Sequence, residues 1–167
     1  YGILMKAAVQ ALMTACANRK YLGATPAVMA VLHTWTATME YHPHVHLLVS
    51  AGGVNGDEPQ WRAPAEGFPA PVRVLSRLVE GVFMDLLGKK RPYLKAALPK
   101  PEKRHKWVVW AQCIDYGVER VLDYLGRYAH RIAISNNRII AMDDTHVVFR
   151  HKDRKANKWR VMRLTGH

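Results

Sequence analysis

The stretch YHPHVHLLVSAGG, residues 41–53, decides the fold, because polar and apolar residues alternate in its first half as they do in a β-strand with two unlike faces. Alternate residues of an extended strand point to the same side. His44 and His46 are therefore expected on one face and Val45 on the other. Two imidazoles at this spacing can bind one divalent metal ion.

Further elements are predicted on both sides of this strand from apolar periodicity and turn residues. Helices are expected at residues 4–18, 72–87 and 117–130, with Gly88 ending the second. Strands are expected at residues 28–38, 44–50, 107–112, 139–142, 147–150 and 159–164. The last three, with a tight turn at Asn136-Asn137, predict a C-terminal β-meander. Strands mixed with a few helices, without regular alternation, indicate an α+β fold with a mainly antiparallel sheet.

Length and composition exclude several classes of protein. The chain has 167 residues, of which 49% are apolar and 23% charged, enough for a folded core in one domain. Its most apolar stretch, residues 3–17, is too short to span a membrane. Two cysteines cannot form a disulfide scaffold or a four-cysteine zinc site. Because the first residue is Tyr1, we expect a fragment of a longer protein.

The positive charge lies in the C-terminal two thirds of the chain. The net charge is +12, and residues 1–60 are neutral in sum. Basic clusters occupy residues 89–106, which begin with Lys89, Lys90 and Arg91, and residues 150–163. Tyr93, Trp107, Trp110 and Trp159 lie within or beside these clusters. Cations that follow phosphates and rings that stack on bases are typical of single-stranded nucleic-acid binding.

A second candidate site lies on the helix predicted at residues 117–130. Tyr124 and Tyr128 are one helical turn apart and therefore share a face. On one side of the tyrosines, Val121, Leu122 and Leu125 form an apolar stripe. On the other side, Arg120, Arg127 and Arg131 form a cationic stripe. A tyrosine can act as a covalent nucleophile, and nearby cations can orient a phosphate.

Together these motifs resemble a known family. The run HPHVH followed by Gly-Gly, and YLGRYAHRIAISNNRI some eighty residues later, are similar to the two-tyrosine HUH transposases of rolling-circle insertion elements. His44-Val45-His46 matches the histidine–hydrophobic–histidine motif, and Tyr124 and Tyr128 match the tyrosine pair. The upstream segment VLHTW, residues 31–35, also fits the family's pattern.

The resemblance implies an HUH-nuclease-like, ferredoxin-related central antiparallel sheet with packed helices, plus the C-terminal meander. It implies a catalytic core at residues 1–135 and an extension of the same domain at residues 136–167. The implied cofactor is Mg²⁺ or Mn²⁺, bound by His44, His46 and a third ligand. His42 is favoured for that ligand, with Gln112 and Glu40 as alternatives.

The implied activity is that of a transposase that cleaves and rejoins DNA through a 5′-phosphotyrosine. Its implied partner is single-stranded DNA at the ends of a mobile element, contacted by basic residues: Arg120, Arg127, Arg131, Lys89, Lys90 and Arg91. The implied location is the bacterial cytoplasm, at the nucleoid, with no membrane contact.

Two other functions compete with this one. A metal hydrolase built on His-x-His would use the histidines but leaves the paired tyrosines unexplained. A non-catalytic single-stranded nucleic-acid-binding module would explain the charge and the aromatic residues, but it gives the histidines no role. Metal-dependent cleavage of a single-stranded oligonucleotide separates the three.

Overall fold

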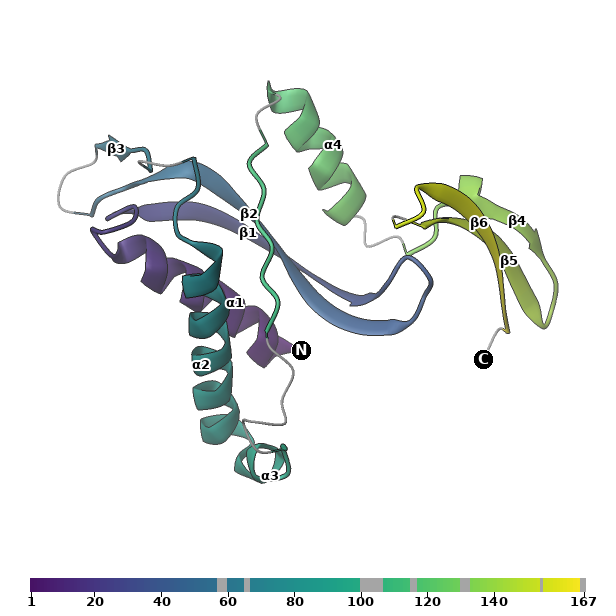
Figure 1. Cartoon of the computed structure of the whole chain (residues 1–167), viewed down its shortest axis with the longest axis horizontal. Coiled ribbons are helices and arrows are strands. Elements are labelled where there is room, and N and C mark those ends of the chain that lie inside the picture. The colour runs from purple at the N-terminus through teal and green to yellow at the C-terminus, as the bar shows by residue number, and fades with distance from the viewer. Residues whose placement is uncertain are drawn as a thin grey trace.

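The computed structural model describes residues 1–56, 60–64, 67–99, 107–114, 117–129, 133–153 and 155–165, and in its last α-helix it omits the side chains of residues 118, 123, 124 and 127–129. The fold is α+β, with two three-stranded antiparallel sheets (Figure 1). The elements, in chain order, are α1 (Gly2–Ala17), β1 (Thr25–Trp35), β2 (Tyr41–Val54), β3 (Trp61–Arg62), α2 (Val72–Lys90), α3 (Pro92–Ala96), α4 (Gly117–Ala129), the 3₁₀ turn η2 (Asn136–Arg138), β4 (Ile139–Met142), β5 (His146–Asp153) and β6 (Lys158–Thr165).

β1 and β2 form a long hairpin whose register decides which residues share a face. His33 lies opposite His44, and residues directly opposite each other point to the same side. The next pair, Leu32 and Val45, therefore points to the other side. The hairpin thus has one face with imidazoles and one with aliphatic side chains, as the alternation in residues 44–46 predicts.

The core forms where the helices cover the aliphatic face of the hairpin. Most of the buried residues of α1 are small, which lets the helix approach the sheet closely: Ala7, Ala8, Ala11, Leu12, Ala15 and Cys16. Leu12, Ala15 and Cys16 form one buried cluster with Leu75 of α2, and Val28, Leu47 and Val49 of the hairpin pack against it. Burial of the Cys16 thiol raises its pKa, as expected for a structural cysteine. α1 and α2 therefore pack on the face of the hairpin opposite the histidines.

Two glycines let β2 continue beyond the point where the sequence predicts its end. Gly53 pairs with Pro26 of β1 on one side and with Arg62 of β3 on the other. A Cβ atom at Gly53 would lie 2.5 Å from the carbonyl oxygen of Thr25. Gly52-Gly53 therefore serves close strand packing rather than a turn, and β2 extends to Val54.

The C-terminal meander is confirmed as a separate sheet with the order β4-β5-β6. Phe149, at the centre of β5, is fully buried, and the guanidinium carbon of Arg138 lies 5.7 Å from its ring centroid. Arg138 also donates hydrogen bonds to the carbonyl oxygens of Arg150, at 2.8 Å, and Ala37, at 3.3 Å. Since Ala37 lies in the β1–β2 turn, Arg138 connects the meander to the hairpin.

Two local expectations are wrong. The segment at residues 107–112, expected as a strand, is irregular and joins neither described sheet, and its Trp107 carbonyl accepts a hydrogen bond from the Ser76 hydroxyl. The helix α2 passes Gly88 and ends at Lys90, and Gly88 instead leaves room for the side chain of Lys95. The tight turn expected at Asn136-Asn137 is confirmed, since the Arg138 amide donates to the Ser135 carbonyl oxygen at 2.8 Å and the two asparagines begin η2. Among the described residues, no helix is both long and apolar enough to cross a membrane.

Candidate metal centre and its surroundings

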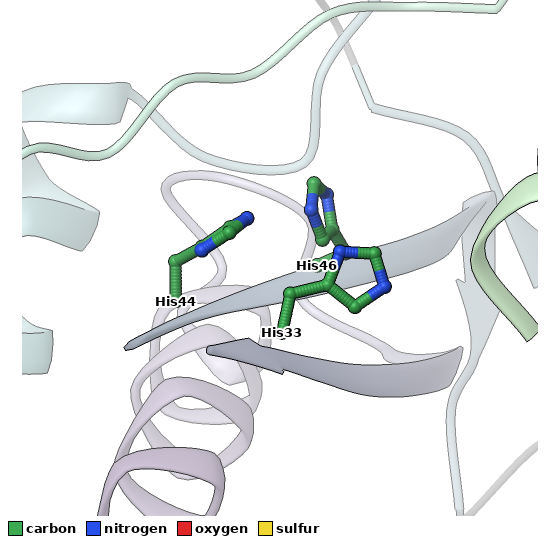
Figure 2. A group of neighbouring side chains, drawn as sticks. All are labelled: His33, His44 and His46. Carbon is green, nitrogen blue, oxygen red and sulfur yellow. The ribbon is translucent and has the colours of Figure 1, made fainter. Parts of the chain in front are cut away.

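Three histidines converge on the open face of the hairpin. Figure 2 shows His33 rising from one strand and His44 and His46 from its neighbour, with all three imidazoles on the same side. One ring nitrogen from each lies within 4.8 Å of the others. The ring centroids of His33 and His46 are 4.7 Å apart, and those of His44 and His46 are 4.8 Å apart. This spacing allows all three side chains to bind one metal ion.

The convergence follows from strand geometry. His44 and His46 share a face because they are two residues apart, and His33 joins them because it pairs with His44 across the hairpin. The three candidate ligands lie on two paired strands, which main-chain hydrogen bonds hold together. The backbone therefore preorganises the cluster, which lowers the entropic cost of binding an ion.

His42, the favoured third ligand, is not a member of this group. Trp35 pairs with Tyr41 while His33 pairs with His44, so His42 and Pro43 together oppose one residue of β1. Such a bulge interrupts the simple alternation on which the prediction of His42 rests. Proline is tolerated at bulges, which explains how Pro43 fits within a continuous strand.

His42 acts instead through its main chain. Its carbonyl oxygen lies 2.7 Å from Nδ1 of His44. Because a carbonyl can only accept, Nδ1 of His44 carries the proton, and Nε2 is the nitrogen left to bind a metal ion. Bonds of this kind fix the tautomer and the ring orientation of metal-binding histidines.

His33 is the most enclosed member of the cluster. It is 8% exposed, and its ring stacks on that of Trp35 with centroids 4.9 Å apart and planes at 17°. The indole therefore holds the imidazole in place and shields it from water. The sequence contains a signal for this residue, because His33 and Trp35 alternate in the VLHTW segment. Only the register of β1 on β2 shows that His33 lies opposite His44.

Of the other two candidate ligands, Glu40 is not a member of the cluster, and Gln112 stays a prediction. Glu40 is exposed in the hairpin turn, where its backbone amide donates to Thr36 Oγ1 at 3.2 Å. Gln112 is exposed in the irregular segment at residues 107–114. The three histidines thus offer a complete set of three candidate ligands without Glu40.

The predicted tyrosine helix is present as α4, with Tyr124 and Tyr128 one turn apart in its backbone. The side chains of Tyr124, Arg127 and Tyr128 lie outside what the structure describes, as does the whole of Arg131. Leu122, expected to pack down on the sheet, is 59% exposed. The apolar stripe of α4 is therefore not fully covered. That the two tyrosines lie close to the histidines stays a prediction.

The remaining basic candidates occupy two places. Arg120 is exposed on α4, within the same helix as the tyrosines. Lys89, Lys90 and Arg91 lie at the end of α2, far from the hairpin turn in Figure 1. Lys89 also forms an exposed ion pair with Asp85, at 2.8 Å. The structure therefore does not bring this second group to the histidine cluster.

The chain is similar to proteins described as putative transposases. The Y2_Tnp family model, described as putative transposase, matches residues 27–167. A relative from Sinorhizobium fredii, named putative transposase y4qJ, is 40% identical over 183 aligned positions. The alignment covers 99% of this chain and 46% of the relative, so the chain spans less than half the length of that protein. No solved structure gives a significant match.

Proposed function

We propose, because this chain belongs to the Y2_Tnp family of transposases, that it cleaves and rejoins single-stranded DNA at the ends of a mobile element. The observation that carries the proposal is the cluster of His33, His44 and His46 on one face of the hairpin. In this proposal the fold is HUH-nuclease-like, with a catalytic core at residues 1–135 and the meander at residues 136–167 as its extension.

The donor chemistry of the cluster fits a divalent metal ion. Three imidazoles on a preorganised strand pair could hold one ion, and the bond from His44 Nδ1 to the His42 carbonyl leaves Nε2 for it. Imidazole suits transition metals better than Mg²⁺, which prefers oxygen ligands. Of the two ions implied by the resemblance, the cluster therefore favours Mn²⁺. The ion would polarise the scissile phosphate.

The tyrosines supply the nucleophile in this proposal. The hydroxyl oxygen of Tyr124 or Tyr128 forms a bond to phosphorus while the bond from phosphorus to the 3′ oxygen breaks. The phenol proton passes to the leaving oxygen, so a free 3′-hydroxyl and a 5′-phosphotyrosine result. Attack by a 3′-hydroxyl on this linkage reverses the step and rejoins the strand. Two tyrosines permit two cleavages before rejoining.

This chemistry requires α4 to lie across the histidine-bearing face. Exposed apolar side chains on both elements support that arrangement, since Leu122 of α4 is 59% exposed and Met29 of β1 is 47% exposed. Met29 pairs with Leu48 and so shares the face of the histidines. Docking α4 there would bury apolar surface and carry Tyr124 and Tyr128 toward the cluster.

The test is formation of a covalent adduct. The chain is incubated with Mn²⁺ and a labelled single-stranded oligonucleotide, and the products are separated on a denaturing gel. The unmodified chain should give a metal-dependent adduct, each single Tyr→Phe variant at 124 or 128 should retain one cleavage, and the double variant should give none. Tyr93→Phe is the matched control, because Tyr93 is 66% exposed on α3.

The alternatives give different results in this assay. A His-x-His hydrolase would cut the oligonucleotide in the double Phe variant without any adduct. A binding module would retain the oligonucleotide and cut nothing. An adduct that persists in the double variant would show that another tyrosine is the nucleophile.

A further inference from the structure

The C-terminal sheet has an outer face that the proposed cleavage chemistry does not use. We call it the Trp159 face and define it by five side chains: Arg150 and Lys152 of β5, and Trp159, Val161 and Arg163 of β6. All five residues are exposed, with Trp159 at 59% and Val161 at 66%. An exposed indole and an exposed valine among cations indicate a binding surface rather than a merely solvated one.

The register of β5 on β6 places these side chains together. Lys152 lies opposite Trp159, and Arg150 lies opposite Val161. Arg163 lies two residues beyond Val161 and therefore points to the same side. The five residues thus form one continuous patch across two paired strands.

Arg150 is held against the tryptophan ring. Its guanidinium carbon lies 5.5 Å from the centroid of Trp159, and its Nη2 donates to the carbonyl oxygen of Asn137, at 3.2 Å. Both contacts restrain a side chain that is otherwise flexible. A planar cation beside a planar ring provides an extended stacking surface in a fixed orientation.

Charge is separated between the two faces of this sheet. Asp153 points to the opposite side from Lys152, and there it forms an ion pair with Arg160, at 2.9 Å. On the side of Trp159, β5 and β6 carry no aspartate or glutamate. Asp153 therefore neutralises a cation on the side of the buried Phe149. The charged side chains that define the Trp159 face are all cations.

We propose that the Trp159 face binds single-stranded nucleic acid, with a base stacked on Trp159 and the phosphates on Arg150, Lys152 and Arg163. Cations alone would suit a duplex or an acidic protein equally well. The exposed indole favours a single strand, because only unpaired bases offer their faces for stacking. This binding needs neither the histidine cluster nor the tyrosines.

The experiment measures equilibrium binding of the 167-residue chain by fluorescence anisotropy, in EDTA so that no metal-dependent step contributes. The probes are a labelled unstructured oligonucleotide, its duplex and a poly-glutamate peptide. Trp159→Ala should weaken binding of the single strand by about 5- to 150-fold, as expected for one stacked base. Trp61→Ala is the matched control, because Trp61 is 61% exposed on β3, and it should retain the affinity.

A second pair of variants tests the cations on the same strand. Arg163→Ala should lower the slope of log affinity against log salt concentration by about 0.7, the value for one phosphate contact on a single strand. Arg160→Ala removes the same charge from the side of the buried Phe149 and should leave the slope nearly unchanged. Trp159→Phe should recover part of the affinity, and thermal melting of each variant checks its fold.

The result that overturns the proposal is equal affinity of Trp159→Ala and the unmodified chain for the single strand. Equal loss in Arg160→Ala and Arg163→Ala would show that net charge, not this face, determines binding. Tighter binding of the duplex or of poly-glutamate would assign the face to another partner. Failure of the cleavage assay would leave these outcomes intact, since binding is measured without metal.

Discussion

Replacement of His33 by phenylalanine tests the metal centre most directly. Phenylalanine keeps an aromatic ring stacked on Trp35 and removes both nitrogens, so packing is retained while one of three ligands is lost. His42→Phe is the matched control. It removes an imidazole from the same hairpin but keeps the carbonyl oxygen that accepts the bond from His44 Nδ1.

The magnitude follows from linkage between binding and folding. With Mn²⁺ at 100 times its dissociation constant, a three-ligand site gains about 2.7 kcal/mol of folding free energy. At about 2–4 °C per kcal/mol, the melting temperature should rise by roughly 5–11 °C. Loss of a supporting group alone typically costs up to ~100-fold in metal affinity, and loss of a ligand should cost at least that. The gain in His33→Phe then falls to at most about 0.4 kcal/mol, or roughly 1–2 °C.

The assay is thermal unfolding followed by circular dichroism, with and without Mn²⁺ at one fixed concentration. The unmodified chain and His42→Phe should show the same upward shift, and His33→Phe should show almost none. Two results would refute the reasoning. A full shift in His33→Phe would mean that His33 is no ligand, and a lost shift in His42→Phe would restore His42 as the third ligand.

Three further predictions concern the meander and its attachment. Phe149→Ala should lower the free energy of unfolding by about 3–5 kcal/mol in urea titrations, because Phe149 is fully buried; a loss below 1 kcal/mol would contradict this core role. Arg138→Met should cost about 1–2 kcal/mol and increase amide exchange in β5, since it removes the bonds to Arg150 and Ala37; unchanged exchange would show that Arg138 does not hold the sheet. The hydrogen bond from the Thr145 hydroxyl, with those from the Thr145 and His146 amides, lowers the pKa of Asp143 from 3.8 to about 2. Its contribution to stability should therefore be complete above pH 3.8 and vanish as the pH falls through about 2, which NMR titration of the carboxyl resonance checks; a midpoint near 3.8 would contradict it.

Local pattern in the sequence was enough to predict most elements and one face of the site. Alternation in residues 44–46 places His44 and His46 together because a strand repeats every two residues. Helical periodicity predicts α1, α2 and α4 within a few residues of their bounds, and three short apolar runs predict the meander. These features depend on backbone geometry over a few residues. The order of polar and apolar residues is therefore enough to predict them.

Contacts between distant segments required the tertiary structure. His33 joins the cluster only because β1 pairs with β2 in one register, and the bulge at His42 and Pro43 removes the ligand that simple alternation favours. In the same way, the register of β5 on β6 selects which cations share a face with Trp159. A shift of one residue in either register would turn each side chain to the other face, and no local pattern determines that register.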